Sequence, residues 1–446
     1  MAAKRYRMTY ARSIAMGFLI VICCGTLLLT LPVASKSGDW TALVNAFFTA
    51  TSATCVTGLI IGDTYTYWSL FGQIVILLLI QIGGLGFMTM ISMFTIFARK
   101  NVSFHERRLL MESFRSMQYN GIVALLKRIL IGTFCCEFLG AVILSLRFVP
   151  QMGLGQGIYY GIFHSVSAFC NAGFDLMGKY REFSSFTDYT GDAVVCLTLI
   201  SLIIIGGLGF LVWTDLAKNK FHFQRFSLHS KIVLSVTAFL ICFGWGAFYF
   251  SESQGVFANL NGVDKAVAAL FQSVSPRTAG FNSVDQASLS DTGYILTLFY
   301  MFVGGSPGST AGGIKTTTIF VVLICAIASA RNSDTITVFK KRLDNVMVRQ
   351  ATSIVTIYFA AVILATAVIC IIEPFDLEAI LFDVVSAVGT VGLSFGITPS
   401  LTAASKIILS LLMFFGRIGG LTLFLVLLEK NKKVPVERPV ERILIG

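Results

Sequence analysis

The stretch SVSAFCNAGFDLM (residues 165–177) combines apolar flanks with a polar and flexible centre. The centre holds Ser167, Asn171, Gly173 and Asp175, and long apolar segments lie before and after it. Backbone that leaves a helix at membrane depth is tolerated only where protein buries it or where it lines a water-filled cavity. The stretch therefore predicts a loop built into the interior of a membrane protein.

The composition of the whole chain supports a membrane location. Of its 446 residues, 55% are hydrophobic and only 13% are charged, and the mean hydropathy is +0.80. A soluble protein carries about 25% charged residues. Several apolar runs can cross ~30 Å of hydrocarbon as helices, so we predict an all-α polytopic membrane protein. The first run lacks a cleavage signature and is expected to be a membrane helix rather than a signal peptide. The runs are 14–33, 70–98, 129–146, 193–213, 232–250, 295–303, 319–330, 354–372 and 407–428.

Cysteine and histidine patterns predict no metal site and no disulfide framework. All ten cysteines lie in or beside apolar runs and none forms a CxxC pair, so we expect small buried apolar side chains. The four histidines lack the HExxH spacing of a zinc site. We therefore expect no cofactor in this chain.

The opening stretch is one of four copies of a pattern. In each copy a Phe is followed four residues later by Ser, and a Gly follows that Ser after six residues, or after five in the third copy. A Gly-Gly pair recurs 24 to 33 residues beyond that Gly. Four matches in register predict a chain of four consecutive units. The copies are Phe48/Ser52/Gly58, Phe163/Ser167/Gly173, Phe271/Ser275/Gly280 and Phe382/Ser386/Gly392.

Each unit is expected to contain a membrane helix, a short helix, a Gly-containing pore loop and a second membrane helix. The short helices are expected at 40–52, 157–169, 264–275 and 375–388, which is too short to span a bilayer. The predicted units are 1–98, 99–217, 218–330 and 331–446, the last with a cytosolic C-terminal tail.

Four such loops can surround one pseudo-fourfold axis. The short helices would direct their partially negative C-terminal ends toward that axis, which favours a cation. The glycines would let the backbone turn its carbonyl oxygens inward, as in a potassium filter. We predict one ion pore, with potassium at the backbone carbonyls of four filter segments. The filter residues are Val56, Thr57, Gly58, Asn171, Ala172, Gly173, Thr278, Ala279, Gly280, Thr390, Val391 and Gly392.

Charged residues are distributed unequally between the two predicted sides. The N-terminus, the linkers at 99–128, 218–231 and 331–349, and the tail from 429 hold 25 of the 34 Lys and Arg residues. The opposite side holds 14 of the 23 acidic residues. By the positive-inside rule the basic side, with both termini, is cytoplasmic. The net charge of +11 thus reflects topology and does not indicate nucleic acid binding, whereas the acidic outer face would concentrate cations.

The motifs TCVTGL, CNAGF, PRTAGF and GTVGL, with IQIGGLGFMT, resemble the Trk/Ktr/HKT superfamily of potassium transporters, and most of all its bacterial KtrB/KtrD-type membrane subunits. The resemblance covers nearly the whole chain. It implies channel-like potassium uptake across the bacterial cell membrane, with sodium as a candidate activator. It also implies a homodimer in membrane lipid, bound to a cytosolic ring of KtrA/KtrC-type nucleotide-binding subunits. Gly58 matches the potassium-selective pattern, because superfamily members with Ser there tend to pass sodium.

The third unit contains a break. The stretch FVGGSPGSTAGGIKTTT (302–318) lies within residues 294–330, which as one helix would extend ~55 Å, far beyond the bilayer core. Five glycines and Pro307 within 304–313 predict a loop at membrane depth. Residues 308–316 nearly match a nucleotide-binding P-loop, but Ile314 interrupts the motif and no βαβ unit surrounds it.

The resemblance implies a gating loop at this place, just below the filter, with Arg417 on the helix that faces it. A buried Arg is costly and normally has a partner. The predicted gate residues are Gly304, Gly305, Ser306, Pro307, Gly308, Ser309, Thr310, Gly312, Gly313, Lys315 and Arg417.

Other polar or flexible positions in the apolar runs have simpler interpretations. The GGLGF motifs at 83–87 and 206–210 are expected to be helix-packing contacts. Glu137 is expected to contact a polar group on a neighbouring helix, with an ion-pathway role as the alternative. An ion-coupled secondary cation transporter is the alternative function and would need inverted repeats. A polytopic enzyme would need clustered catalytic side chains, which the sequence does not show, so no enzyme is expected.

Overall fold

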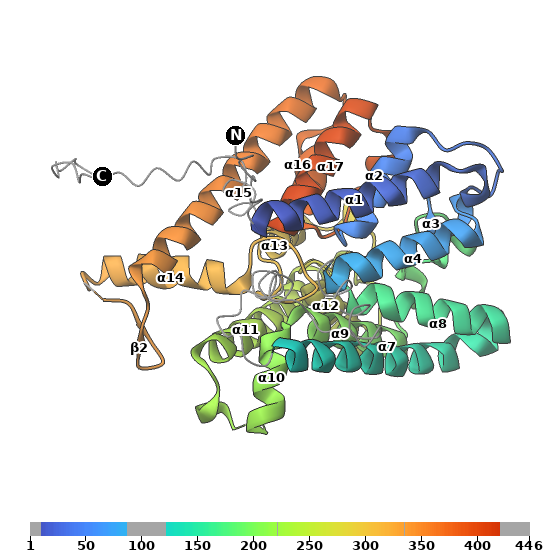
Figure 1. The fold of residues 1–446 in the computed structure, drawn as a ribbon. Coiled ribbons are helices and arrows are strands. Elements are labelled where there is room, and N and C mark those ends of the chain that lie inside the picture. The colour runs from blue at the N-terminus through green and yellow to red at the C-terminus, as the bar shows by residue number, and fades with distance from the viewer. Residues whose placement is uncertain (1–9, 87–121, 221, 334, 420–446) are drawn as a thin grey trace, which may run out of the picture.

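A computed structural model describes residues 10–86, 122–220, 222–333 and 335–419 of the chain (Figure 1). These residues are mainly helical, as predicted. One small two-stranded antiparallel hairpin, β1 (Thr337–Val338) and β2 (Lys341–Arg342), is an addition to the predicted all-α fold. The predicted N-terminal basic segment, most of the 99–128 linker and the C-terminal tail lie outside the described residues.

The helices follow one another in four groups, each with a long helix, a short helix and further apolar helices. The first group is α1 (Tyr10–Thr30), α2 (Leu43–Thr54), α3 (Thr64–Tyr67) and α4 (Leu70–Leu85), and the second is α7 (Ile122–Met152), α8 (Leu154–Phe169), α9 (Ala193–Gly207) and α10 (Phe210–Asn219). The third is α11 (Leu228–Ser251), α12 (Gly262–Val274), α13 (Asp291–Phe302) and α14 (Thr316–Ala330), and the fourth is α15 (Asn345–Ile372), α16 (Leu377–Gly389) and α17 (Ala403–Ile418). Short 3₁₀ turns are η1 (Pro32–Ala34), η2 (Met177–Lys179), η3 (Thr187–Tyr189), η4 (Phe223–Arg225), η5 (Gln286–Ser288) and η6 (Thr398–Ser400).

Polar caps set where several of the apolar helices begin. Ser69, Asp192, Ser227, Ser290 and Thr402 each accept a hydrogen bond from a backbone N–H in the first turn of the following helix. Such a side chain replaces a partner that the first turn lacks. These residues therefore fix the starts of α4, α9, α11, α13 and α17 at the ends of apolar runs.

The long helices identify a multi-pass membrane protein. Helices α1, α7, α11 and α15 are long and apolar enough to cross a bilayer, and α9 with α10 can form a further, bent crossing. Large apolar side chains point away from the protein, such as Phe250 at 81% exposure and Ile371 at 86%. Side chains of this kind are stable on a protein surface that contacts hydrocarbon rather than water.

The four short helices agree with the prediction to within three residues at each end. The repeated Phe lies inside each short helix, and Phe48, Phe163, Phe271 and Phe382 are completely buried. The repeated Phe thus anchors each short helix in the core.

Contacts between the groups form a closed circle. Helix α4 contacts α8, α9 contacts α12, and α13 contacts α16, which joins each group to the next. Helix α2 contacts α17, which joins the first group to the last. The four groups therefore surround a common centre, although the predicted unit boundaries stay predictions.

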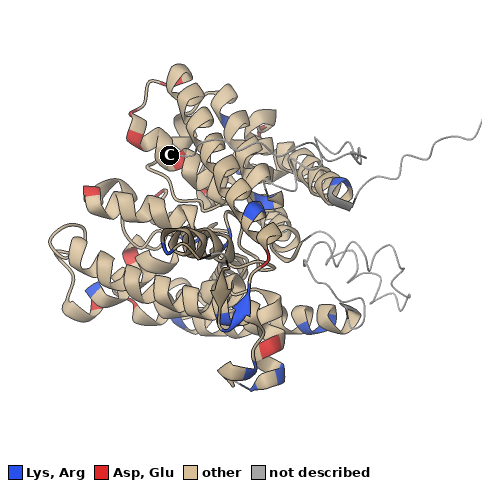
Figure 2. Cartoon of the chain, turned by 90° about the vertical axis from the view of Figure 1, so that its left-hand side faces the viewer, with Lys and Arg blue, Asp and Glu red and all other residues tan. Residues whose placement is uncertain are grey.

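The described chain has two distinct ends (Figure 1). The α1–α2 connection and α3 lie on the right of that view, whereas the β-hairpin lies on the left and α10 lies at the bottom. After a quarter turn, most acidic residues lie toward the left-hand side of Figure 2. The acidic residues are thus distributed unevenly over the protein, which fits a membrane protein with two different faces.

The apolar run expected at 193–213 is not one continuous helix. Helices α9 and α10 are bent by 94° relative to each other, with Leu208 and Gly209 between them. Gly209 has φ of 94°, which a residue with a side chain rarely adopts. The second group therefore contains a break of its own, opposite the break that the sequence predicts in the third group.

Candidate functional site

Each short helix is followed by one of the four predicted filter segments, here called filter segments, and each has an alternating backbone. The first residue has positive φ in all four: 56° at Val56, 58° at Asn171, 75° at Thr278 and 51° at Thr390. The third residue is the repeated Gly, with φ between 71° and 98°, and the middle residue keeps a negative φ. Alternating the sign of φ orients successive peptide groups alike, so N–H groups point to one side and carbonyl oxygens to the other.

The positive φ of the four glycines could be predicted from the sequence, but the positive φ of the first residue of each filter segment could not. A residue with a side chain, above all a β-branched one, is costly in the left-handed region, at about 1–2 kcal/mol. Val56, Thr278 and Thr390 are all β-branched and nevertheless adopt it. Such strain persists only where the surroundings over-determine the conformation, and it marks functional sites. The repeated occurrence at equivalent positions in this chain was not foreseen from composition or spacing.

The repeated Ser of each short helix holds its own filter segment. The Ser52 and Ser386 hydroxyls accept from the N–H of Gly58 at 3.1 Å and of Gly392 at 3.0 Å. The Ser167 hydroxyl donates to the carbonyl of Phe174 at 2.7 Å. In the third copy the Ser275 hydroxyl donates to the Phe281 carbonyl at 2.5 Å. The Ser in the sequence pattern is thus explained as a side-chain brace for the segment that follows.

The third copy has one residue fewer between its Ser and its Gly, and the backbone accommodates this difference at the end of the short helix. In the second copy the N–H of Ala172 donates to the Ser167 carbonyl, five residues back. In the third copy the N–H of Ala279 donates to the Ser275 carbonyl, four residues back, at 2.9 Å. The third short helix therefore ends differently from the second, and the filter segment keeps its conformation.

The four glycines form a closed ring of close contacts. A Cβ added to Gly58 would lie 2.5 Å from the Ala172 carbonyl oxygen, and one on Gly173 would lie 2.8 Å from that of Ala279. A Cβ on Gly280 would overlap the Val391 carbonyl oxygen still more closely. One on Gly392 would meet the Thr57 carbonyl oxygen in the same way. Each filter Gly therefore faces the middle residue of the next copy, and the fourth copy returns to the first.

The predicted break in the third group is a loop between α13 and α14. Gly304 N–H donates to the Ile314 carbonyl at 2.9 Å, and Thr316 N–H donates to the Gly305 carbonyl at 3.1 Å. Lys315 Nζ donates to the carbonyls of Ala311 and Gly312, at 2.7 and 2.9 Å. These bonds close the loop at its base, so residues 304–313 form a compact unit.

This loop docks onto the break between α9 and α10. Ser306 N–H donates to the Gly207 carbonyl at 3.0 Å, and Phe210 N–H donates to the Gly308 carbonyl at 2.8 Å. A Cβ on Gly209 would lie 2.7 Å from the Pro307 carbonyl oxygen. Backbone groups that lack helical partners at the bend between α9 and α10 thus form hydrogen bonds with the loop, as buried backbone groups require.

The GGLGF motifs do more than the expected helix packing. Gly84 packs against Cys170, where an added Cβ would lie 2.6 Å from Sγ, so close packing is confirmed. In the second motif the carbonyls of Gly206 and Gly207 also accept hydrogen bonds from the loop. The second motif therefore positions the loop as well as the helix.

The loop lies directly against three filter segments, and it meets the second where Thr310 Oγ1 lies 3.5 Å from Asn171 Oδ1. A Cβ on Gly304 would lie 3.2 Å from the Thr278 methyl carbon, and one on Gly313 would lie 2.7 Å from the Gly389 carbonyl oxygen. A Cβ on Gly312 would overlap the Thr390 hydroxyl. The loop glycines thus allow an approach to the filter that side chains would prevent.

Arg417 connects the loop to the end of α4. Its guanidinium donates to the Thr310 carbonyl of the loop and to the carbonyls of Gly83 and Gly84. The Gly84 distance is 3.1 Å. The predicted partner of this Arg is therefore a set of backbone carbonyls rather than an acidic side chain.

Glu137 behaves as predicted, as a polar contact between helices. Gln81 on α4 donates to both carboxyl oxygens of Glu137, at 3.0 and 3.2 Å. The Cys170 thiol lies within 3.7 Å of the Gln81 amide oxygen, and Cys170 directly precedes Asn171. Sequence reasoning missed this cluster of Gln81, Glu137 and Cys170 behind the second filter segment.

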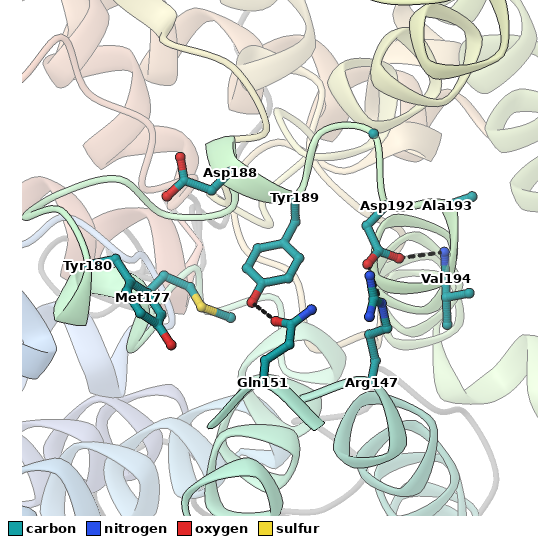
Figure 3. A pocket seen from close by; sticks show the side chains of 10 residues that line it. Arg147, Gln151, Met177, Tyr180, Asp188, Tyr189, Asp192, Ala193 and Val194 are labelled. Carbon is teal, nitrogen blue, oxygen red and sulfur yellow. Dashed lines mark hydrogen bonds and ion pairs between the residues drawn. The ribbon is translucent and has the colours of Figure 1, made fainter. Parts of the chain in front are cut away.

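A cavity of about 790 Å³ lies apart from the ring, among α7, η3 and α9 (Figure 3). There Arg147 Nε pairs with Asp192 Oδ2 at 2.6 Å, and Tyr189 donates to Gln151 at 2.6 Å. Asp192 also caps α9. These contacts tie the end of α7 to the start of α9, and none of the predicted site residues lines the cavity.

Comparison with known proteins places these features in context. The family model described as TrkH, cation transport protein, matches residues 4–435. A potassium/sodium uptake protein of Enterococcus hirae, NtpJ, is 39% identical over 99% of this chain and 98% of its own length. The Ktr system potassium uptake protein B of Bacillus subtilis is 38% identical over the same shares of the two chains. The crystal structure of the potassium transporter TrkH from Vibrio parahaemolyticus matches with a TM-score of 0.75 at 19% identity, over 96% of this chain and 86% of that one.

Proposed function

The chain belongs to the TrkH family of cation transport proteins, and we propose that it takes up potassium across the bacterial cell membrane through the ring of four filter segments. The closed ring of Gly58, Gly173, Gly280 and Gly392 is the observation that carries this proposal. The names of the relatives at 38–39% identity, which describe potassium and potassium/sodium uptake, support the substrate.

The ring offers a physical basis for cation selection. Four alternating segments orient their carbonyl oxygens alike, and carbonyl oxygens can replace the hydration shell of potassium. Four short helices end at these segments, so the negative ends of their dipoles favour a cation there. Backbone carbonyls, rather than acidic side chains, would therefore hold the ion.

We further propose that the loop at 304–313 is a gate beneath the filter. It lies against three filter segments, and the Lys315 ammonium and Arg417 guanidinium add positive charge that a permeating cation would avoid. The loop is held mainly by backbone hydrogen bonds to α9 and α10 and by Arg417. Displacing it would require these bonds to break together.

Regulation is proposed to come from outside the chain. The name "Ktr system" of the Bacillus subtilis relative implies a system with further components. We propose a cytosolic nucleotide-binding ring of the KtrA/KtrC type, a homodimer of this chain in membrane lipid, and cytoplasmic termini. Sodium is a proposed activator. Native mass spectrometry of co-expressed subunits should show a membrane dimer bound to a soluble ring, and a fully regulated monomer would contradict this.

Rubidium flux into proteoliposomes, without an energy source, tests the proposed uptake. A passive flux that follows an imposed voltage and exceeds sodium flux supports a filter. A flux that stops unless an ion gradient drives it would favour the alternative of an ion-coupled secondary transporter. No flux of either ion by correctly inserted protein, with or without its partner, would exclude both.

A further inference from the structure

Thr310 is a point where the loop is joined to several other elements. Its N–H donates to the Gly206 carbonyl at 3.3 Å, and its carbonyl accepts from Arg417. Its hydroxyl donates to the Phe169 carbonyl at 3.1 Å. Phe169 is the last residue of α8, and the last carbonyls of a helix lack partners within it. Thr310 therefore satisfies the end of the short helix that leads into the second filter segment.

The same hydroxyl lies beside the first residue of that segment. Thr310 Oγ1 is 3.5 Å from Asn171 Oδ1, and Asn171 Nδ2 donates to Thr278 Oγ1 at 3.3 Å. A hydroxyl has one proton to donate, and the shorter distance favours Phe169 as its acceptor. All three side chains are buried. They form a polar path from the loop, through the second filter segment, to the third.

The path ends at a residue that needs support. Thr278 has φ of 75°, which is costly for a β-branched residue, whereas Asn171 at 58° belongs to a type that tolerates this region. Asn171 bonds the Thr278 hydroxyl, and the loop passes under the Thr278 methyl group at Gly304. Two of the contacts that hold this strained residue therefore depend on where the loop lies.

We propose that Thr310 is a positioning residue for ion selection. Its hydroxyl fixes the end of α8 at Phe169, two residues before Asn171. It thereby fixes the shape of the second filter segment and, through the Asn171 amide, that of the third. This inference rests on the proposed function of the four segments as an ion filter. It follows that the loop does more than block the path, because moving it also changes which ion the filter prefers.

Two substitutions at Thr310 test the role of the hydroxyl. Thr310→Val keeps the size and removes the hydroxyl, whereas Thr310→Ser keeps the hydroxyl. The ratio of rubidium to sodium flux in proteoliposomes should fall roughly three- to tenfold in Thr310→Val, the change that the loss of one hydrogen bond supplies. Thr310→Ser should keep the native ratio. A native ratio in Thr310→Val, or an equal loss in Thr310→Ser, would overturn the proposal.

Thr316→Val provides a matched control at the base of the loop, on the first residue of α14. The Thr316 hydroxyl is buried and lies 3.2 Å from the Ser306 hydroxyl, so its removal loosens the loop without touching Asn171 or Phe169. The flux ratio should stay unchanged in this variant. A loss equal to that of Thr310→Val would mean that any disturbance of the loop lowers selectivity, and Thr310 would have no special role.

A double substitution tests whether the path acts as one unit. Asn171→Ala should lower the flux ratio, and adding Thr310→Val should lower it little further, because residues on one path are not additive. Fully additive losses would overturn the shared path.

Gly58→Ser separates this inference from the filter proposal. If Gly58→Ser leaves the ratio unchanged, the filter proposal fails, whereas a loss in Gly58→Ser with none in Thr310→Val defeats the Thr310 inference alone.

Discussion

Gly392 lies so close to Thr57 that a Cβ on Gly392 would overlap the Thr57 carbonyl oxygen. The two residues belong to the last and the first filter segments, at opposite ends of the chain. Their contact closes the ring that the other three Gly contacts begin. A linear series of four units would not bring the fourth Gly to the first segment, so this contact is what favours a single central path.

Gly58→Ser should lower the preference for potassium. Gly58 has φ of 95°, and its added Cβ would lie 2.5 Å from the Ala172 carbonyl oxygen, so the neighbouring segment must move. Because the carbonyl positions determine selection, we expect the rubidium-to-sodium flux ratio to fall roughly tenfold. Flux in proteoliposomes measures this directly.

Gly396→Ser is the matched control for that experiment. Gly396 also has positive φ, at 86°, but nothing lies within 4 Å of an added Cβ. The substitution imposes backbone strain, but its side chain contacts no filter segment, so the flux ratio should remain native. An equal loss in both variants would assign the effect of Gly58→Ser to strain and would remove its support for the ring.

Deleting residues 306–312 should raise potassium flux in the absence of the partner. The deletion removes the loop that lies against the second, third and fourth filter segments, together with one of the carbonyls that accept from Arg417. We expect basal flux to rise by roughly tenfold or more, since no barrier beneath the filter would remain. If inserted protein shows lost or unchanged flux, the loop is not the barrier. Because Thr310 is deleted as well, the ion preference should fall in the same variant.

Asp175 should make uptake depend on pH. It follows the second filter segment, and burial together with the nearby Asp63 carboxylate raises its pKa from 3.8 to about 7. The carboxyl is therefore mostly neutral at pH 6 and mostly charged at pH 8. A negative charge there attracts cations, so uptake at low potassium should rise about threefold across this range. Asp175→Asn should abolish the rise, and an unchanged pH profile in that variant would rule out this carboxyl as the cause.

The Asp175 carboxyl should also make the stability of the folded state depend on pH, but stability should fall where uptake rises. Between pH 3.8 and about pH 7, the Asp175 carboxyl retains a proton in the folded state that it releases in the unfolded state. Stability from this group should therefore decrease as the pH rises through that window. The thermal midpoint of Asp175→Asn should lack this contribution, which comparison of the two proteins at pH 5 and pH 8 can measure.

Much of the architecture could be predicted because the repeat places the same residue types at the same spacing. The buried Phe48 and its three equivalents fix the short helices, and the glycines fix where those helices give way to loops. The positive φ of Val56 could not be predicted, because a β-branched residue avoids that conformation unless its surroundings impose it. The break at Gly209 could not be predicted for a related reason. The carbonyl that accepts the hydrogen bond of the Phe210 N–H at this break belongs to Gly308, far away in the sequence. The partners of Arg417 are backbone carbonyls, which no sequence pattern displays.

Gly209→Ala should release the loop without touching the filter. Gly209 has φ of 94°, and its Cβ would lie 2.7 Å from the Pro307 carbonyl oxygen, beside the bond from Phe210 N–H to Gly308. The substitution adds about 1–2 kcal/mol of backbone strain and pushes on the docked loop. If the loop is the gate, the open population and the basal rubidium flux should rise roughly five- to tenfold. Gly153→Ala is the control, because Gly153 has φ of 86° with nothing within 4 Å of its Cβ, and its basal flux should stay native. Equal increases in the two variants would mean that general destabilisation, rather than release of the loop from the α9–α10 break, opens the path.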